Sequence, residues 1–438
     1  MLRPIAHRDF PFYTPKGAIP VGGALRDLLL GRRPQDLDFV AEDPRKAAQD
    51  AQSHLGGTLF PLDEERGQYR LVTGGLVLDF SPLEGSLEED LLKRDFRLNA
   101  LFWRQNRILG IRGADEDLNR RVLVPVREAN LYEDHLRSLR AVRLAASLGL
   151  GLPGETRNAL SHHARFLQAH LEALPARERV KEELSRLLLS PRAAWGFHLL
   201  ERTGLLDVYL PELRLLVGLK QGGVHHLDGW QHTLSVLFHL AWLWPEAPLE
   251  ARLAALYHDV GKALTRRFDP EVGRFRFLGH AEVGAEIARA ALSWLRFPQE
   301  GVERVQALVR RHMDRPPEER KALRRFLLKR LPLLPDLLYL MAADRLGAKG
   351  VEREAWILID IFQEILEEPL PTKPLLSGEE VMALLRLSPG PEVGRALAAL
   401  LEAQAEGRVK TPEEARAFLL YWRNGKETQA PRAPDHPH

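Results

Sequence analysis

The spacing of apolar residues changes along the chain, and this change limits the possible folds more than any other feature. Before about residue 124, short apolar runs alternate with turns, whereas from Leu131 onward apolar residues recur three and four positions apart. The first pattern is typical of a sheet with helices packed against it, and the second of amphipathic helices. The sequence therefore predicts an N-terminal α+β domain followed by an all-helical remainder.

Five apolar runs in the first part have the length and flanking turns of strands, and two stretches have the periodicity of helices. The predicted strands are 18–21, 37–40, 69–72, 76–80 and 101–103, and the predicted helices are 24–30 and 44–55.

The composition limits the chemistry that the chain can perform. Of its 438 residues, 45% are hydrophobic and 28% charged, as in globular proteins, and none is cysteine. Without cysteine, disulfides, iron–sulfur clusters and thiolate zinc sites are excluded, so any metal must be held by His, Asp or Glu. The first residues lack the apolar core of a secretion signal, and the longest uncharged stretch, 229–245, is too short and polar to span a bilayer. We therefore expect a cytoplasmic protein.

The segment PVGGALRDLLLGRRPQDLDFV, residues 20–40, carries the most chemical information. Gly22 and Gly23 join a strand to a helix, which lets a ligand approach the backbone and face the first amides of that helix. Arg26, on the same helix, is a candidate partner for phosphate. These features together predict a site for a triphosphate.

The strand that follows carries two acidic residues, Asp36 and Asp38, with Leu37 between them. Alternate residues of a strand lie on one face, so the two carboxylates are neighbours. Neighbouring carboxylates repel each other unless a cation lies between them, which predicts a Mg²⁺ site. Asp79, within the apolar strand 76–80, is either a third carboxylate of this site or an ordinary charge at the end of a strand.

Four motifs, in this order, resemble those of the bacterial-type (class II) tRNA nucleotidyltransferases and their poly(A) polymerase relatives. They are GGALRD with DLD, DLLKRDFRLNALFW, LYEDHLRSLRAVRLAA and RERVKEEL, and the resemblance covers about the first 190 residues. It implies a DNA-polymerase-beta-like head at 1–124 and a helical neck and body at 125–219, which select the nucleotide and bind tRNA. One departure is Arg97, where the family usually has a small polar residue.

The resemblance also implies a reaction. Asp36, Asp38 and Asp79 would be the catalytic carboxylates, and Asp36 and Asp38 would bind two Mg²⁺ ions that assist attack of the RNA 3′-hydroxyl on the α-phosphate of a nucleoside triphosphate. Selection of CTP, and possibly ATP, would need no nucleic-acid template. The implied nucleotide-binding residues are Gly22, Gly23, Arg26, Arg94, Asp95, Asn99, Glu133, Asp134, Arg137, Arg140 and Arg179.

Two groups among these residues have separate implied roles. Arg94, Asp95 and Asn99 would hold the ribose and the phosphates. Asp134 and Arg137 are three residues apart, so on one helix they share a face and could present an acceptor and a forked donor to the edge of a base. The motif at 177–179 would brace that helix. Acidic residues at 133–134 are equally typical of a first helical turn, where they interact with the helix dipole.

A loop that is long in the family is short here. In the family, a flexible loop after the strand of the third carboxylate resets the pocket from C to A, but here only SPLEG separates Phe80 from the next helix. The gap favours an enzyme that adds CC from CTP. Three alternatives remain open: a full CCA-adding enzyme, a poly(A) polymerase, and a phosphohydrolase whose head only binds RNA.

The helical part holds a second set of candidate ligands. His258-Asp259 ends one helix, His232 lies on the helix before it and Asp344 lies far downstream. This order resembles the HD superfamily of metal-dependent phosphohydrolases over about residues 220–350. The resemblance implies two additional ligands and a phosphate-binding lysine, which are His280, His312 and Lys262.

The HD resemblance implies hydrolysis of 2′,3′-cyclic phosphates or of phosphate ends, which would restore a 3′-hydroxyl to damaged tRNA. Nitrogen and oxygen ligands suit Mn²⁺, Ni²⁺, Co²⁺ or Mg²⁺, and the sequence does not choose among them. Residues 301–330 contain ten basic and four acidic side chains and are either a tRNA contact or a solvated helix face. Residues 351–438 are predicted to form a helical tail, to which we assign no chemistry.

Overall fold

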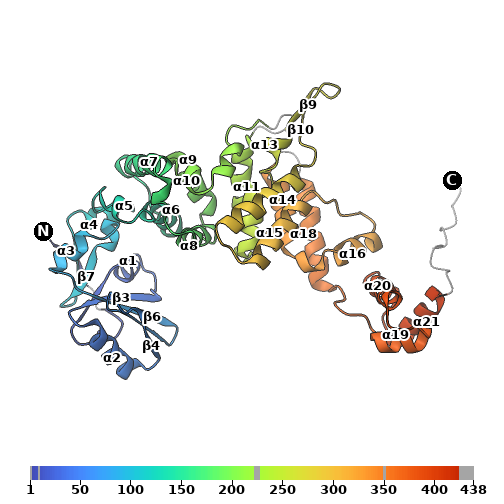
Figure 1. The fold of residues 1–438 in the computed structure, drawn as a ribbon, viewed down its shortest axis with the longest axis horizontal. Helices are drawn as coiled ribbons and strands as arrows, with labels where there is room; N and C mark the ends of the chain where they lie inside the picture. The colour runs from blue at the N-terminus through green and yellow to red at the C-terminus, as the bar shows by residue number, and fades with distance from the viewer. Residues whose placement is uncertain (1, 8–9, 221–226, 349–351, 424–438) are drawn as a thin grey trace. The chain divides into compact units, whose positions relative to one another are not determined.

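The computed structural model describes residues 2–7, 10–220, 227–348 and 352–423 (Figure 1). The chain divides into two compact units. Unit 1 comprises residues 1–219 and 290–299, and unit 2 comprises residues 220–289 and 300–438. No helix within the described ranges has the length and apolar character needed to cross a membrane.

Unit 1 begins with an eight-stranded sheet in the order β1-β8-β7-β2-β3-β6-β5-β4. The only parallel pair of this sheet is β3 with β6, so Asp38 lies beside Asp79 in register. The strands are β1 Arg3–His7, β2 Ala18–Val21, β3 Asp36–Ala41, β4 Thr58–Asp63, β5 Gln68–Thr73, β6 Leu76–Pro82, β7 Leu101–Arg104 and β8 Arg107–Gly110.

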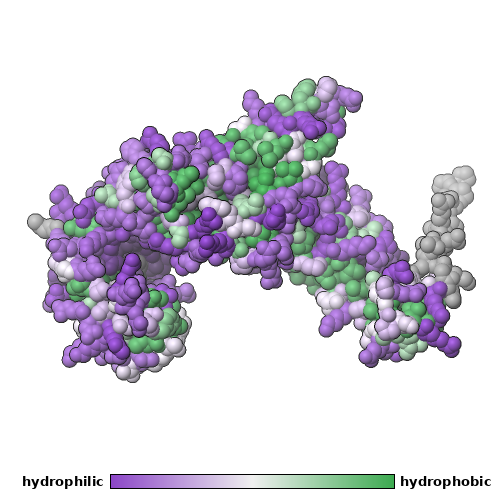
Figure 2. Space-filling model, in the orientation of Figure 1, coloured by the Kyte–Doolittle hydropathy of each residue, from purple (hydrophilic) through white to green (hydrophobic). Residues whose placement is uncertain are grey.

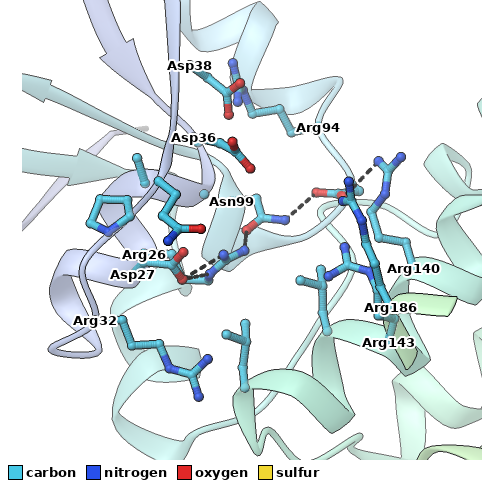
Figure 3. Close-up of a pocket in the computed structure, with 18 of the residues that line it drawn as sticks. Arg26, Asp27, Arg32, Asp36, Asp38, Arg94, Asn99, Arg140, Arg143 and Arg186 are labelled. Carbon is cyan, nitrogen blue, oxygen red and sulfur yellow. Dashed lines mark hydrogen bonds and ion pairs between the residues drawn. The ribbon is translucent and has the colours of Figure 1, made fainter. Parts of the chain in front are cut away.

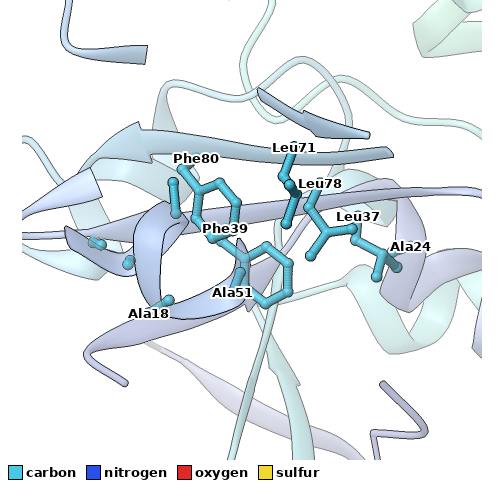
Figure 4. Close-up of a cluster of buried hydrophobic side chains, with 11 residues drawn as sticks. Ala18, Ala24, Leu37, Phe39, Ala51, Leu71, Leu78 and Phe80 are labelled. Atoms are coloured by element: carbon cyan, nitrogen blue, oxygen red, sulfur yellow. The ribbon is translucent and has the colours of Figure 1, made fainter. Parts of the chain in front are cut away.

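Helix α2 (Pro44–Leu55) covers one face of the strands β3 to β6. It begins at Asp43, whose side chain accepts a hydrogen bond from the Lys46 amide, and it ends at Gly56, where φ is 70°. Its buried alanines pack against stacked Phe39 and Phe80, whose ring centroids are 5.2 Å apart (Figure 4). This apolar face fixes the register of β3, and the period of two then places Asp36 and Asp38 on the opposite face.

The remaining elements of unit 1 are helical. They are α1 Gly23–Leu29, α3 Leu87–Leu92, η1 Arg97–Asn99, α4 Ala114–Arg120, α5 Asn130–Glu133, α6 Arg137–Leu148, α7 Gly154–Ala169, η2 Leu171–Ala173, α8 Arg177–Leu188, α9 Ala193–Thr203, α10 Leu205–Tyr209 and η3 Pro211–Leu216. Helix α6 packs against both α8 and α9, and its buried face is mostly Leu, Val and Ala. The predicted change from a sheet to helices therefore occurs within unit 1.

The described part of unit 2 is helical except for one short hairpin. Its elements are α11 Gly229–Leu243, α12 Leu249–Tyr257, α13 Lys262–Thr265, β9 Arg267–Asp269, β10 Arg274–Arg276, α14 His280–Trp294, α15 Gln299–Arg311, α16 Arg320–Leu328, η4 Leu331–Leu333, α17 Asp336–Gly347, α18 Glu352–Glu367, α19 Gly378–Leu385, α20 Pro391–Ala405 and α21 Pro412–Arg423. The end of α14 and the turn after it group with unit 1. Helices α19, α20 and α21 share a small apolar core of their own.

The observed elements agree closely with the prediction. All five predicted strands and both predicted helices of the head are present, and β1, β4 and β8 are additional strands. The β9–β10 hairpin departs from the all-helical expectation, because its three-residue strands are too short to leave a periodic signal. The predicted helical tail is present as far as Arg423, and residues 424–438 lie outside the described residues. Figure 2 shows a mainly hydrophilic surface on unit 1 and an apolar area on unit 2 near α11 and α13.

Candidate functional site

A cavity of about 630 Å³ in unit 1 brings together many of the predicted nucleotide-binding residues (Figure 3). Eight arginines and four aspartates line it, so the lining carries four more positive than negative charges. The arginines are Arg26, Arg32, Arg33, Arg94, Arg137, Arg140, Arg143 and Arg186, and the aspartates are Asp27, Asp36, Asp38 and Asp95. A cavity of this size and charge suits a polyanion as large as a nucleoside triphosphate.

Asp36 and Asp38 project from the same face of β3 into this cavity. Burial raises the pKa of Asp38 to about 6; Arg94 opposes the shift, whereas the charges of Asp79 and Asp36 add to it. A divalent cation between these carboxylates would remove the repulsion, and carboxylate oxygens are the ligands that Mg²⁺ prefers. The residues present therefore fit a magnesium site.

Asp79 lies beside Asp38 but is held by another partner. The Arg70 guanidinium donates to both Asp79 oxygens, with Nε to Oδ1 at 2.7 Å and Nη2 to Oδ2 at 2.8 Å. Asp79 is not among the residues that line the cavity. A role as third carboxylate would require this ion pair to open or to share Asp79 with a cation.

The glycine pair leaves room beside the carboxylates, although one of its amides is already used. A Cβ on Gly22, where φ is 82°, would lie 2.9 Å from Arg94 Nη1 and 3.1 Å from Asp38 Oδ2. Any side chain there would therefore fill the space next to Asp38. The Gly22 amide donates to the Leu101 carbonyl at 3.0 Å, so it is not free to bind a ligand.

A chain of hydrogen bonds joins Arg26 to the neck across the cavity wall (Figure 3). Arg26 Nη1 donates to Asn99 Oδ1 at 2.6 Å, and Asn99 Nδ2 donates to Asp95 Oδ1 at 2.9 Å. Asp95 Oδ2 in turn lies 3.4 Å from Arg140 Nη1. This chain fixes four of the predicted nucleotide-binding residues relative to one another.

Two further arginines differ in where they point. Arg94 pairs with Asp90 at 3.0 Å and lines the cavity. Arg97, the departure from the family pattern, lies 3.7 Å from Asp117 of α4 and is absent from the cavity lining. The unusual residue is thus directed at α4 and away from the predicted nucleotide contacts.

The region predicted to select the base is built differently from the expectation. Asp134 lies in a break between α5 and α6 with an extended backbone (φ −140°, ψ 102°), so it does not share a helix face with Arg137. Asp134 Oδ2 instead accepts from Arg179 Nη2 at 2.9 Å. Although burial alone would raise it, the pKa of Asp134 is lowered by this bond and by the Arg179 charge. The predicted bracing motif therefore contacts Asp134 directly.

Arg137 lines the cavity, but its guanidinium is already bonded. It donates to the carbonyls of Asn130, at 2.9 Å, and Lys93, at 2.8 Å, and lies 3.5 Å from Glu133. Glu133, Asp134 and Arg179 are outside the cavity lining. The structure thus brings Arg137 and Arg140 to the cavity and leaves the other three predicted residues of this group behind them.

Four lining arginines were missed by the sequence analysis, namely Arg32, Arg33, Arg143 and Arg186. Arg143 had a signal, because Arg137, Arg140 and Arg143 are spaced by three residues on one helix and lie within a motif of the resemblance. Arg143 pairs with the buried Glu183, which also accepts from Arg140. Arg32 and Arg33 lie between α1 and β3, and Arg186 lies on α8, so their spacing carried no comparable signal.

In unit 2, four predicted ligands converge from α11, the end of α12 and α17. His232 Nε2 is 3.0 Å from Asp344 Oδ1 and 3.2 Å from His258 Nε2. Asp259 Oδ2 lies 3.3 Å from His258 Nε2 and 3.5 Å from His232 Nε2. His232, His258 and Asp259 are at most 2% exposed. Their atoms are close enough to hold one metal ion.

The two additional histidines form a second group on the other oxygen of Asp259. His280 Nε2 and His312 Nε2 are 3.3 Å apart, and they lie 3.5 and 3.8 Å from Asp259 Oδ1. This group is again compact enough for a metal ion. Asp259 thus presents one oxygen to each group, which is the arrangement of a carboxylate between two ions.

The backbone orients the four imidazoles. Each Nδ1 lies beside a carbonyl oxygen: Gly347 for His232, Ala255 for His258, Phe277 for His280 and Val309 for His312. A proton on Nδ1 leaves the Nε2 lone pair available to a metal. Burial lowers the pKa of His312 to about 4 and also lowers the pKa of His280, which favours the neutral, ligating form.

Lys262 and Arg345 balance the acids of this cluster. Lys262 Nζ is 2.6 Å from Asp259 Oδ2, and Arg345 Nη1 is 2.9 Å from Asp344 Oδ2. The pKa values of both aspartates are lowered, because neighbouring cationic and imidazole groups outweigh the effect of burial. The six predicted ligands and Lys262 are therefore all in one place.

The basic segment 301–330 is largely neutralised within unit 2. Arg304 pairs with Asp336, Arg320 with Glu364 and Glu368, Arg325 with Glu406, and Arg330 with Asp314. Arg324 is 5% exposed and donates to backbone carbonyls. These contacts favour neither a tRNA contact nor a solvated helix face, because most of these arginines form ion pairs with acids elsewhere in unit 2.

Comparisons with known families and proteins agree with this geometry. "Poly A polymerase head domain" matches residues 18–84, "Probable RNA and SrmB-binding site of polymerase A" matches 149–216 and "HD domain" matches 229–349. These families imply dependence on divalent metal.

Two similar proteins and one similar structure cover nearly the whole chain. A CC-adding tRNA nucleotidyltransferase of Thermus thermophilus is 75% identical over 99% of this chain and 100% of its own length. An A-adding tRNA nucleotidyltransferase of Deinococcus radiodurans is 47% identical over 93% of this chain and 96% of its own. The structure of the Bacillus stearothermophilus CCA-adding enzyme in complex with CTP is 26% identical, covers 94% of both chains and has a TM-score of 0.65.

Proposed function

Because the chain belongs to the tRNA nucleotidyltransferase and poly(A) polymerase family, we propose that it adds two cytidines from CTP to the 3′ end of tRNA without a template. The observation that carries the proposal is 75% identity to a CC-adding enzyme over that enzyme's whole length. A cavity whose lining suits a triphosphate supports it. Its substrates are then tRNA and CTP.

The reaction is a phosphoryl transfer in which the RNA 3′-oxygen bonds to the α-phosphorus of CTP and the bond to the leaving pyrophosphate breaks. Two Mg²⁺ ions on Asp36 and Asp38, when bound, would supply charge neutralisation and alignment of the attacking and leaving oxygens. Arg26 and Arg94 neutralise the phosphates, and the excess of arginine in the lining holds pyrophosphate charge as it develops. Most of the rate enhancement is then positioning and electrostatics.

Selection of the base rests on the start of α6. Arg137 lines the cavity and offers a planar fork of donors, and Asp134 is held just behind it by Arg179. Reading a base edge requires Arg137 to exchange its carbonyl partners for the base, and Asn99 and Asp95 hold the ribose. In this proposal, Glu133 orients Arg137.

Specificity for CC, and not for CCA, is supported by two observations. The connection from β6 to α3 spans only residues 83–86, which leaves no length for a loop that resets the pocket to ATP. The relative named as a CC-adding enzyme is 75% identical to this chain, whereas the relative named as an A-adding enzyme is 47% identical. The cytoplasmic location stays a prediction.

Product length tests the proposal. tRNA ending at the discriminator base is incubated with CTP alone, ATP alone or both, and the products are resolved on a sequencing gel. Addition of two residues with CTP, and no further addition with ATP, is expected. Addition of a third residue with both nucleotides would indicate a CCA-adding enzyme, and long products with ATP alone a poly(A) polymerase.

We also propose a second activity, hydrolysis of phosphate esters at the His/Asp cluster of unit 2. Six buried or partly buried nitrogen and oxygen ligands in two groups that share Asp259 support it. Mn²⁺, Ni²⁺, Co²⁺ and Mg²⁺ all accept such ligands. Lys262 would hold a phosphate oxygen, and the neutral imidazoles hold the ions. The proposed substrates are 2′,3′-cyclic phosphates and phosphorylated RNA ends.

Release of product from 2′,3′-cyclic AMP, with each of the four metals in turn, tests this activity. His258→Ala should abolish turnover, whereas His239→Ala should leave it intact, because the half-buried His239 ring bonds to Ser235 of its own helix and is not part of the cluster. Equal turnover by the two variants would mean that the cluster is not the site.

A further inference from the structure

A second cavity, of about 730 Å³, also opens onto Asp38, one of the two carboxylates of the proposed magnesium site. It shares Asp38 and Arg94 with the first cavity but has otherwise separate lining residues. Both cavities belong to unit 1. Asp38 and Arg94 therefore form the boundary between two spaces, each large enough for a nucleotide.

The floor of the second cavity continues the face of the sheet that carries the acids. Val40 follows Asp38 by two residues on β3, and its register partner on β6 is Ser81, which follows Asp79 by two. Gln68 at the start of β5 extends the lining. Because side chains two apart share a face, this floor leads directly to the proposed magnesium ligands.

The walls come from three neighbouring segments. Glu65 and Arg66 lie in the turn between β4 and β5, Pro82 ends β6, Glu84 lies on the short connection after it, and Asp90 belongs to α3. The short connection that bears on CC specificity thus forms a wall of this cavity. A longer connection would change its shape.

The charges of the two cavities differ in sign. The first has four more positive than negative lining residues, whereas the second has two basic residues, Arg66 and Arg94, against four acidic ones. A triphosphate is repelled by such an acidic lining. The terminal nucleoside of an RNA instead brings hydroxyl and amino donors for carboxylates, and a single phosphate for Arg66.

The geometry of the reaction needs two such spaces. In phosphoryl transfer the attacking and leaving oxygens lie roughly in line on opposite sides of the phosphorus. If CTP occupies the arginine-rich cavity, the 3′-hydroxyl must reach the Asp36 and Asp38 site from elsewhere. The second cavity provides that route, since it ends at Asp38.

We propose that this second cavity receives the 3′-terminal nucleotide of the RNA acceptor, with Arg66, Gln68 and Ser81 as positioning residues. This proposal rests on the proposed nucleotidyltransferase function. The attacking 3′-oxygen stays bonded to the acceptor ribose and releases its hydroxyl proton to solvent, and pyrophosphate leaves into the other cavity. The shape of the second cavity, set partly by the short β6–α3 connection, then limits which RNA ends are extended.

Steady-state kinetics with tRNA and CTP varied separately test the proposal. Arg66→Ala should raise KM for tRNA by about tenfold, the effect of losing one charge-assisted hydrogen bond, and leave KM for CTP unchanged. Arg120→Ala is the matched control, because Arg120, like Arg66, is an exposed arginine paired with a nearby acid on its own segment, and it lines neither cavity. Ser81→Phe, which fills the floor, should have the same selective effect, with its melting temperature measured to verify folding.

A modified acceptor sharpens the test. With tRNA whose last nucleotide lacks a base, the wild-type enzyme should have a higher KM for RNA. On this acceptor, Ser81→Phe should raise KM for RNA by a smaller factor than it does with intact tRNA. Equal losses on both acceptors, or a rise in KM for CTP in place of tRNA, would overturn the proposal. Failure of the wild-type protein to extend tRNA at all would instead overturn the proposed function.

Discussion

The carboxylate site of unit 1 and the His/Asp cluster of unit 2 balance acidic charge in opposite ways. In unit 1, carboxylates alternate with arginines around an open cavity, and Asp38 keeps a pKa of about 6. In unit 2, the acids are surrounded by imidazoles whose Nε2 atoms already lie within 3.0 to 3.8 Å of the carboxylate oxygens. We therefore expect an anionic substrate with its cations to complete the first site, and metal alone to complete the second.

This difference teaches which site is preorganised. The imidazoles of unit 2 are oriented by backbone carbonyls, so little rearrangement accompanies metal binding. In unit 1, Asp79 and Arg137 are held by other partners and must exchange them when substrates arrive. We therefore expect tight resident metal in unit 2 and transient metal in unit 1.

The largest expected effect separates the two sites by mutation. Asp38→Asn should lower CTP addition by at least about 10³-fold, since metal stabilisation of the transition state is worth several kcal/mol. Hydrolysis of 2′,3′-cyclic AMP by the same variant should not change. Both rates are measured on one preparation, with Glu42→Gln, an exposed acid just after β3, as the control.

His258→Ala should give the reverse result, with hydrolysis lost and CTP addition retained. If either variant lost both activities while its melting temperature stayed at the wild-type value, the division into two independent sites would be wrong.

Metal removal should have the next largest effect and should act on stability. Dialysis against a chelator should lower the melting temperature of the wild-type protein by several degrees, because ligands that bind only the folded state stabilise it by mass action. Returning Mn²⁺ or Ni²⁺ should restore the transition. His258→Ala should melt at the same temperature with and without metal, whereas Asp38→Asn should respond as the wild type does. If Asp38→Asn, and not His258→Ala, abolished the change in melting temperature on chelation, the resident metal would be in unit 1.

The parts of both sites that depend on local sequence could be predicted, and the parts that depend on tertiary contacts could not. The period of two in β3 was enough to place Asp36 and Asp38 on one face, and β2, β3 and α2 appear within one residue of their predicted bounds. Similarly, the six candidate ligands of unit 2 came from motif order alone, and they meet in one cluster.

The errors occurred where a distant partner decides the conformation. The break at Asp134 is stabilised by Arg179, 45 residues away, and this pair cannot be seen in the local helical period. The ion pair between Arg70 and Asp79 likewise depends on the register of β5 with β6. Strand β1 pairs with β8, about a hundred residues away, so it had no local partner that would mark it as a strand. Strand β8 does pair locally with β7, but it is only four residues long and leaves little periodic signal.

A smaller effect is expected at the start of α6. Asp134→Ala removes the acceptor held by Arg179, so the position of Arg137 should become less fixed. KM for CTP should rise by about tenfold, as for one charge-assisted hydrogen bond, and the preference for CTP over ATP should fall. Competition of the two labelled nucleotides in one reaction measures that preference. Arg179→Ala should reproduce the effect if the pair acts as a unit, and an unchanged preference in both variants would exclude this region from base selection.

The last prediction concerns stability alone and an acid of unit 1, Asp117, that has neither a bidentate arginine partner nor a surrounding group of imidazoles. Asp117 is 3% exposed, its Oδ2 has no hydrogen-bond partner, and Arg97 is 3.7 Å away. Burial raises the pKa of Asp117 from 3.8 to about 6, with Arg97 opposing the shift. Because the folded state holds this proton more tightly than the unfolded state, the contribution of Asp117 to stability is present below pH 3.8 and is lost as the pH rises to about 6.

Asp117→Asn should remove this pH dependence, because the amide carries no charge to bury. The free energy of unfolding at pH 7 should increase by up to about 3 kcal/mol, taking about 1.4 kcal/mol for each pH unit of the shift. The variant and the wild type should differ least near pH 4. Urea titrations at pH 4 and pH 7 measure both differences. A variant that is less stable at pH 7 would show that Asp117 is ionised and that its attraction to Arg97 outweighs its burial, which would place it with the arginine-balanced carboxylates of the cavity.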